Sequence, residues 1–314
     1  MNNGARKQAY QSVIRALKNP GSGDIVDLTS LTGFGAWKEL LLPLDDKTSW
    51  TQEDLRMEPL VQEFIETLKT NFPDKHEQML ASLRNATLSS FYTPPSIAEP
   101  IAKAIKENTL RIDSILEPSA GTGNFVASLK KEFPGARITA IEKDLLSATL
   151  LQQQHPDIET LHSGFENFSN RKFDVVVSNI PFGNVSVFDD AMFREAIPVK
   201  IKSTTRIHNY FFVKALDNLK EEGLLAFITT NGVMDSPTNK EIREYLMKKS
   251  DLVTAIRLPN NAFESAGTSP VTDIILLRKQ SSKKNLAPHE REFVNSEKML
   301  ATDERNLSVE IHIN

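Results

Sequence analysis

From about residue 110 onward, strand patterns alternate with helical patterns, and this alternation limits the possible folds more than any other feature of the chain. The expected strands are residues 112–118, 137–143, 173–179, 224–230, 252–259 and 272–278. The expected helices are residues 124–133, 145–154, 207–220 and 237–249. Such alternation is typical of an α/β fold with a mostly parallel, doubly wound sheet covered on both faces. The last two strands have no helical pattern between them, so we expect an antiparallel C-terminal hairpin.

The remaining segments suggest three regions. Residues 1–85 form a predicted helical N-terminal region, since segments such as 58–72 carry apolar residues at helical spacing. Residues 86–280 hold the predicted sheet domain. Residues 281–314 form a polar C-terminal tail that we expect to be loosely attached. Within the first region, the glycines and aromatic residues of LTGFGAWKELL (31–41) favour a tight anchoring turn.

Composition excludes several classes of site. The chain has 314 residues and no cysteine, which excludes disulfides, thiolate zinc sites and cysteine nucleophiles. Its six histidines are scattered without helical pairing, so we expect no metal site. No apolar run approaches the roughly 20 residues that span a bilayer, and the N-terminus lacks the apolar stretch of a signal peptide. We therefore expect a cytoplasmic protein, away from membranes. A net charge of −4 argues against a strong sequence-independent grip on nucleic acid.

The first motif with chemical content is ILEPSAGTGNF, where a predicted strand runs into a turn of small residues before a helix. Gly121 and Gly123 would let the backbone approach a ligand that faces the N–H groups of the helix N-terminus. Glu142, at the end of the next strand, is placed to accept hydrogen bonds from both ribose hydroxyls of a nucleotide. This order of strand, turn, helix, strand and acid predicts an adenosine-binding site rather than a plain turn.

Two residues decide which adenosine ligand fits. A dinucleotide fingerprint needs glycine or alanine where this chain has Val126. Glu117, at the end of the first strand, would disfavour a pyrophosphate and suits a ligand with a positive charge or an ammonium group. S-adenosylmethionine has both and carries no phosphate.

The second motif is SNIPFG (178–183), which ends the apolar strand FDVVVSN. We expect this strand to be the fourth and to lie beside the first, at the ligand crevice. The amine of adenine or cytosine is a poor nucleophile, and acceptors for both of its N–H groups favour the tetrahedral nitrogen of the transition state. Asn179 offers a side-chain carbonyl and Ile180 a main-chain carbonyl. Pro181 fixes the turn, and Phe182 offers a face for a flipped-out base. The alternative for this stretch alone is a proline-terminated strand with a core phenylalanine.

A third stretch, SSFYTPPSIAEPIAKAI (89–105), precedes the first strand. It reads as an extended entry to a helix, with Thr93 at the N-cap and proline in the first turn. On its own, this stretch does not distinguish simple capping from a functional role.

Together the three stretches resemble the N6-adenine DNA methyltransferases whose cofactor motif precedes the catalytic motif. FYTPP resembles that family's upstream motif, which closes over the methionine end of the cofactor. LEPSAGTGNF resembles its cofactor loop, and SNIPFG its Asn-Pro-Pro-Tyr/Phe catalytic motif. The resemblance covers residues 85–280. LTGFGAWKELL, IHNYFF and AIRLPNNAF further resemble large methylase–helicase proteins of phages and conjugative elements.

The resemblance implies a Rossmann-like methyltransferase sheet and an enzyme of restriction–modification type that uses S-adenosylmethionine to methylate the N6 amine of adenine in DNA. It places the cofactor against Tyr92, Thr93, Glu117, Ser119, Ala120, Gly121, Gly123, Glu142, Phe165 and Glu166. It assigns the chemistry to Asn179, Ile180, Pro181 and Phe182, and a second aromatic contact with the target base to Phe263. The family usually has proline at position 180, but a main-chain carbonyl contact is also available from isoleucine.

Other readings remain open at this point. Protein-glutamine and RNA methyltransferases use similar Asn-Pro-Pro sites, and a mobile element can keep the fold as a catalytically silent module that binds DNA or a partner. The family usually has a target-recognition domain after the last sheet strand, which residues 280–314 are too short to form, so we expect a separate specificity or helicase subunit. Lys200, Lys202 and Arg206 are the best candidates for contacts with DNA phosphates, with a solvated loop as the equal alternative.

Overall fold

The computed structural model describes residues 3–20, 38–41, 46–86, 92–109, 111–169, 171–259, 262–263, 271–302 and 308–313. Most of the predicted turn at 31–41 lies outside these residues. The chain divides into two compact units. The first comprises Met1–Glu107, Glu117–Phe165 and Asn261–Ser269, and the second comprises Asn108–Leu116, Glu166–Asn260 and Pro270–Asn314. No described helix is long and apolar enough to span a bilayer.

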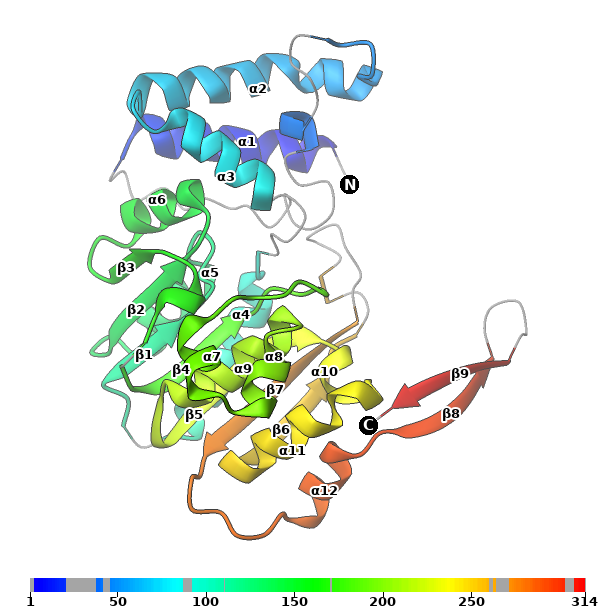
Figure 1. Ribbon diagram of the computed structural model, residues 1–314. Helices are drawn as coiled ribbons and strands as arrows, with labels where there is room; N and C mark the ends of the chain where they lie inside the picture. Colours follow the sequence, from blue (N-terminus) through cyan, green and yellow to red (C-terminus); the bar gives the residue numbers. More distant parts are fainter. Residues whose placement is uncertain are drawn as a thin grey trace. The chain divides into compact units, whose positions relative to one another are not determined.

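A seven-stranded sheet has the strand order β3-β2-β1-β4-β5-β7-β6 (Figure 1). Its strands are β1 (Ser114–Glu117), β2 (Arg137–Glu142), β3 (Glu159–His162), β4 (Phe173–Asn179), β5 (Leu219–Thr230), β6 (Ser250–Arg257) and β7 (Thr272–Lys279). β4 pairs in parallel with β1 and β5, and β7 pairs antiparallel with β5 and β6. The predicted neighbourhood of the first and fourth strands and the antiparallel C-terminal pair are both confirmed.

The central strand β4 is apolar because both of its faces are covered. Val175, Val176 and Val177 are fully buried, as expected for a parallel strand between two helical layers. The order of the strands reverses between β1 and β4, and doubly wound sheets bind ligands at the carboxyl ends of the strands at such a point.

The first unit contains α4 (Pro95–Glu107), α5 (Asn124–Glu132) and α6 (Leu145–Gln154); the second contains α7 (Asp190–Glu195), α8 (Pro198–Ser203), α9 (Ile207–Asp217), α10 (Gly232–Asp235), α11 (Lys240–Lys249) and α12 (Pro288–Val294). The four helices with predicted ranges, α5, α6, α9 and α11, lie close to them, whereas α7, α8, α10 and α12 were not predicted. One boundary differs clearly, because α9 ends at Asp217 and β5 already begins at Leu219. The polar start of β5 contains Glu222 at φ +61°, where the pairing register with β4 shifts. This irregularity interrupts the apolar alternation from which a strand is predicted.

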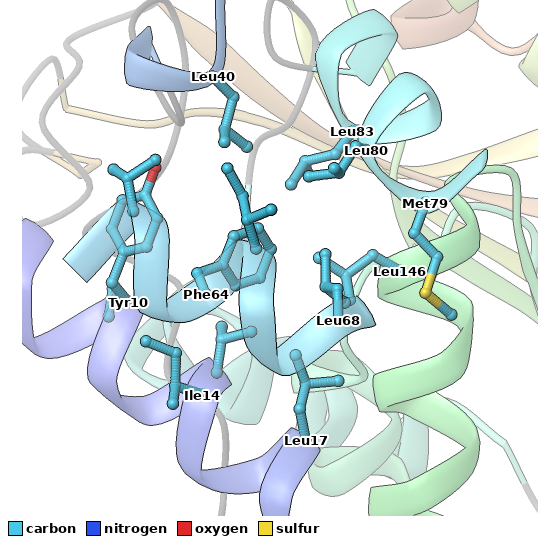
Figure 2. Close-up of a cluster of buried hydrophobic side chains, with 14 of the residues drawn as sticks. Tyr10, Ile14, Leu17, Leu40, Phe64, Leu68, Met79, Leu80, Leu83 and Leu146 are labelled. Atoms are coloured by element: carbon cyan, nitrogen blue, oxygen red, sulfur yellow. The ribbon is translucent and has the colours of Figure 1, made fainter. Parts of the chain in front are cut away.

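The N-terminal region consists of α1 (Asn3–Lys18), a short 3-10 helix η2 (Lys38–Leu41), α2 (Gln52–Asn71) and α3 (His76–Ala86). α2 starts with a capping box, in which Asp54 N–H donates to Thr51 Oγ1 at 3.2 Å and Thr51 N–H donates to Asp54 Oδ2 at 3.0 Å. Its buried face includes Phe64, whose ring packs edge-to-face on Tyr10 at 5.8 Å. The same cluster contains Leu146 of α6 (Figure 2), so the N-terminal helices and part of the sheet domain share one core.

The C-terminal segment begins with α12 and continues as an antiparallel pair, β8 (Glu297–Thr302) with β9 (Ser308–Ile313). Phe293 and Val294 of α12 are buried, and Arg243 Nε donates to the carbonyl of Val294 at 3.0 Å. Glu290 binds both Lys283 and the N–H of Leu252 in β6. The expectation of loose attachment is therefore wrong for residues 283–294, because Phe293 and Val294 are buried and Lys283 and Glu290 are bonded.

Candidate active site

The glycine turn after β1 is fastened to the end of β2. Gly121 N–H donates to Glu142 Oε2 at 2.7 Å, and Ala120 N–H donates to the carbonyl of Ile141 at 2.9 Å. Gly121 has φ +56°, a left-handed conformation that favours glycine. Ala120 is buried in this turn and Ser119 is partly buried beside it. The predicted glycines and the predicted acid are thus brought together by direct hydrogen bonds.

Gly123 cannot be replaced without strain. It forms the N-cap of α5 at φ +97°, and a Cβ on it would lie 2.7 Å from Leu151 Cδ1 and 2.8 Å from His155 Cδ2. Both neighbours belong to α6 or its end, so the turn lies directly against that helix.

The upstream FYTPP stretch reaches the same turn. A Cβ on Gly121 would lie 3.3 Å from the ring of Tyr92, and Asn124 Nδ2 donates to the carbonyl of Thr93 at 2.9 Å. α4 begins at Pro95, so the N-cap position falls on Pro94, and the expectation of Thr93 as N-cap is wrong. Thr93 instead uses its main-chain carbonyl to hold the start of α5.

Two acidic side chains of the first unit lie at the ends of neighbouring strands. Glu117 is 1% exposed, and its Oε2 has no hydrogen-bond partner among the residues that the structure describes. Burial raises the pKa of Glu117 well above its ordinary value, and the nearby Glu142 raises it further. Burial also raises the pKa of Glu142 to about 7, although hydrogen bonds from the N–H groups of Asp144 and Gly121 oppose the shift. A nearby cationic group would favour the ionised form of these carboxyls, so the acceptor pair fits a ligand that carries an ammonium group, as S-adenosylmethionine does.

The second predicted motif lies in the second unit. Asn179 is the last residue of β4, is 7% exposed and is aligned with Ile228 of β5. Ile180 is buried, and its N–H donates to the carbonyl of Ile228 at 3.1 Å. Proline at this position would lack that hydrogen bond, so isoleucine extends the β4–β5 pairing by one residue. Pro181 and Phe182 follow as partly exposed residues before Gly183, whose φ of +132° turns the chain.

The model of the N-6 DNA methylase family matches residues 68–310. The chain belongs to this family. It is 31% identical over 222 residues to the defense against restriction protein B of Escherichia phage P1, covering 67% of this chain and 9% of that protein. It is 24% identical over 191 residues to the type II methyltransferase M.AccI of Acinetobacter calcoaceticus, covering 58% of this chain and 35% of that one.

Further comparisons agree on the fold of this N-6 DNA methylase. The type I restriction enzyme EcoEI methylase subunit of Escherichia coli is 24% identical over 250 residues, 71% of this chain and 49% of that subunit. A putative class I S-adenosylmethionine-dependent methyltransferase from Listeria monocytogenes has a TM-score of 0.55 at 18% identity, with 91% of each chain covered. A modification subunit of a putative type I restriction enzyme from Vibrio vulnificus YJ016 has a TM-score of 0.54 at 20% identity, covering 72% of this chain and 53% of that one. The chain spans 9% to 49% of the length of these three curated relatives.

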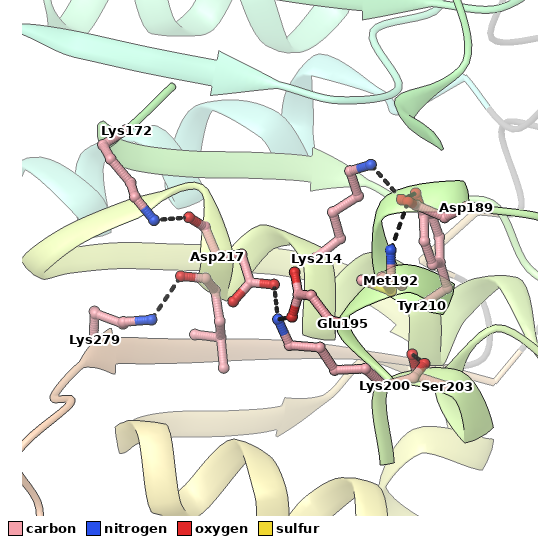
Figure 3. A network of polar contacts seen from close by, with 11 residues as sticks. Lys172, Asp189, Met192, Glu195, Lys200, Ser203, Tyr210, Lys214, Asp217 and Lys279 are labelled. Carbon is pink, nitrogen blue, oxygen red and sulfur yellow. Dashed lines mark hydrogen bonds and ion pairs between the residues drawn. The ribbon is translucent and has the colours of Figure 1, made fainter. Parts of the chain in front are cut away.

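The segment after SNIPFG is held by a buried polar network (Figure 3). Asp189, 1% exposed, accepts hydrogen bonds from Tyr210 Oη at 2.7 Å, from Met192 N–H at 3.1 Å and from Lys214 Nζ. Burial alone would raise the pKa of Asp189, but the hydrogen bonds from Lys214 and Tyr210 outweigh it and the net shift is downward. Lys214 also donates to the carbonyl of Glu166 at 3.0 Å. An acidic residue before a helix is an N-cap signal, but the lysine and tyrosine of α9 follow 21 and more positions later and have no local signal.

Of the three predicted DNA-contacting cations, Lys200 and Lys202 pair with carboxylates, and contact of Arg206 with phosphate stays a prediction. Lys200 is 6% exposed and binds Glu195 at 2.5 Å and Asp217 at 2.7 Å (Figure 3). Lys202 is exposed but pairs with Glu241. The expectation of a phosphate-binding cluster is therefore wrong for Lys200 and unsupported for Lys202, because carboxylates from neighbouring helices neutralise both. The exposed large apolar side chains of this segment are Val185, Phe188, Phe193 and Ile197.

Three further predicted site residues, Phe165, Glu166 and Phe263, lie outside the two motifs described above. Phe165 is buried and Glu166 is partly exposed, both in the 3-10 helix η3 (Phe165–Asn167) after β3. Phe263 is 1% exposed in the first unit. Contact of these residues with cofactor or base stays a prediction. No group of three metal-binding side chains occurs among the residues that the structure describes.

Proposed function

We propose that this chain transfers a methyl group from S-adenosylmethionine to the N6 amine of adenine in DNA. The observation that carries the proposal is the first-unit site: a buried Glu117 with an oxygen that no described residue binds, next to a glycine turn fastened to Glu142. These groups suit an adenosine ligand that carries an amino-acid ammonium group, and they would repel a dinucleotide pyrophosphate. Membership of the N-6 DNA methylase family favours DNA over the protein-glutamine and RNA alternatives.

The binding residues have distinct tasks in this proposal. The Glu142 carboxylate accepts the N–H of Gly121 on one oxygen and the N–H of Asp144 on the other, and it would offer its remaining acceptor capacity to the ribose. Glu117 would accept the ammonium of the methionine part. Gly121 and Gly123 would leave room for the ligand above the start of α5. When bound, S-adenosylmethionine supplies an electrophilic methyl group on its sulfonium sulfur.

The catalytic residues act on the target amine. The Asn179 side-chain oxygen and the Ile180 main-chain oxygen would accept its two N–H groups, which favours the tetrahedral nitrogen that attacks the methyl carbon. Because Asn179 ends a buried strand and Ile180 is bonded to β5, both acceptors are held before the base arrives. Phe182 is partly exposed and offers a stacking face to the flipped base.

The test combines binding with product analysis. Calorimetry should detect S-adenosylmethionine binding that Glu142→Ala weakens at least about tenfold, since each charge-assisted hydrogen bond contributes about 1.5–3 kcal/mol. Glu99→Ala, which removes only an exposed pair with Lys131, should bind like the wild type. Asn179→Ala should lower N6-methyladenine formation on the order of a hundredfold with cofactor affinity unchanged. Full turnover by Asn179→Ala would refute the assignment, and cofactor binding without any methylation would favour the silent-module alternative.

We further propose that target recognition needs a separate specificity or helicase subunit. Lys200 is neutralised inside the protein, Lys202 pairs with Glu241 at the surface, and the chain carries 37 basic against 41 acidic residues. The isolated chain should therefore bind random duplexes weakly. Titration of this chain with duplex DNA at several salt concentrations tests the proposal, and tight, salt-insensitive binding to one sequence would refute it.

A further inference from the structure

The N-terminal helices are hydrogen-bonded to the strand end that carries Glu142. Ser82 of α3 donates from its hydroxyl to Asp144 Oδ2 at 2.7 Å and accepts from Leu145 N–H at 2.9 Å. Asp144 is 6% exposed and caps α6, where its Oδ1 accepts from Ser147 N–H at 2.7 Å. One serine of the N-terminal region thus completes the N-terminus of the helix that follows Glu142.

Further hydrogen bonds lead from Asp144 to Glu142, the carboxylate proposed to bind the cofactor. Asp144 N–H donates to Glu142 Oε1 at 2.7 Å, and Gly121 N–H donates to Glu142 Oε2 at 2.7 Å. Both oxygens of Glu142 are therefore oriented by backbone groups, and one of these groups belongs to the residue that Ser82 holds. The chain of contacts runs from α3 through Asp144 to Glu142 and ends at the glycine turn.

The packing of α3 fixes the serine in place. Met79, Leu80 and Leu83 of α3 belong to one buried cluster with Leu146 and Leu150 of α6 (Figure 2). Leu80 and Leu83 precede and follow Ser82 in the helix and hold it against α6. Because the side chains on either side are buried, the hydroxyl has little freedom to leave Asp144.

We propose that Ser82 is a positioning residue for cofactor binding, and that the N-terminal helices support the proposed cofactor site of the first unit. This inference rests on the proposed function of Glu142. Without the Ser82 hydroxyl, the Asp144 carboxylate loses a donor and Leu145 N–H loses its acceptor. The turn that aims Glu142 loosens, and the less compensated charge of Asp144 makes ionisation of Glu142 harder.

The experiment measures S-adenosylmethionine affinity of the full chain between pH 6 and pH 8.5 by calorimetry. Ser82→Ala should weaken binding by about three- to tenfold and move the pH midpoint of binding upward. Ser82→Thr, which keeps a hydroxyl donor, should restore both quantities. Thr67→Ala is the matched control: it removes a buried hydroxyl of α2 that donates to the carbonyl of Glu63 at 2.7 Å, and it should bind like the wild type.

The outcomes separate this inference from the proposed function. Failure of the wild type to bind S-adenosylmethionine would refute the proposed function itself. Binding by the wild type together with unchanged affinity and midpoint in Ser82→Ala would overturn the role of Ser82 alone. If Ser82→Ala melts below the assay temperature, Ser82→Cys, which is nearly isosteric and a weak donor, replaces it, and wild-type behaviour of that variant overturns the role equally.

Discussion

Replacing Asp189 should destabilise the methylase far more than replacing its neighbour Asp190. Asp189 and Lys214 form an ion pair whose side chains are 1% and 7% exposed, and Asp189 also binds Tyr210. Asp190 pairs with Arg194 on the surface, where the side chains are 57% and 79% exposed. The two aspartates are adjacent in sequence, so the comparison sets a buried network of an ion pair and hydrogen bonds against an exposed ion pair.

The expected magnitudes differ by several kcal/mol. Asp189→Ala leaves the buried Lys214 ammonium without its carboxylate partner, and breaking a buried pair in this way costs about 3–5 kcal/mol. Asp190→Ala removes an exposed helical pair worth about 0.3–0.5 kcal/mol. Because a domain is stable by only about 5–15 kcal/mol, the first change should be visible as a large shift of the unfolding midpoint.

Urea unfolding followed by circular dichroism measures both variants. A double-mutant cycle with Lys214→Met should give a coupling energy of about 2–3 kcal/mol between Asp189 and Lys214, since contacting residues are not additive. If Asp189→Ala and Asp190→Ala unfold within about 0.5 kcal/mol of each other, the buried network does not hold the segment after the catalytic motif.

Three further predictions concern the turn, the acid and a buried histidine. Gly123→Ala should lower the free energy of unfolding by about 1–3 kcal/mol and weaken S-adenosylmethionine binding, because the φ of Gly123 is +97° and a Cβ would collide with α6. Gly135→Ala is the control, since no atom lies within 4 Å of a new Cβ there. Thermal melting and calorimetry should show neither effect for this control. Cofactor affinity should fall below pH 7 and level off above it, since Glu142 must be ionised and its pKa is about 7; a flat calorimetric profile from pH 6 to pH 8 would contradict this. Burial lowers the pKa of His208 from 6.5 to about 4, so on acidification the unfolded chain binds the proton before the folded chain does. The free energy of unfolding should therefore fall as the pH drops from 6.5 to about 4, by at most about 1.4 kcal/mol per pH unit. His208→Leu should flatten that slope in urea titrations at several pH values, and an unchanged slope would show that other groups cause it.

The strands that could be predicted are those with strong apolar signals. β4 was predicted at residues 173–179 and lies at Phe173–Asn179, because a strand buried on both faces is apolar throughout. No bounds could be predicted for β3, whose residues Glu159–His162 are all at least partly exposed. An edge strand of this kind has too little buried surface to leave an apolar pattern in the sequence.

The glycine turn could be predicted for a different reason. Gly121 and Gly123 adopt positive φ angles that other residues resist, so the requirement is local and visible in the residue type. Ser82 and Lys214 could not be predicted, although both bind aspartates close to the proposed site. Their partners lie 62 and 25 positions away, and a polar side chain that pairs over such a separation has no periodicity to reveal it.

The basic residues after SNIPFG also pair with residues that the sequence does not reveal as their partners. A lysine in a sequence looks identical whether its ammonium faces solvent or a carboxylate, and the chain has more acids than bases to offer. Burial of Lys200 is possible only because Glu195 and Asp217 both reach its ammonium, since an unpaired buried charge would be too costly. These partners come from α7 and α9, so the pairing exists only after the helices have packed. A sequence-based prediction of phosphate contacts therefore fails at Lys200, where folding neutralises the charge on which the prediction depended.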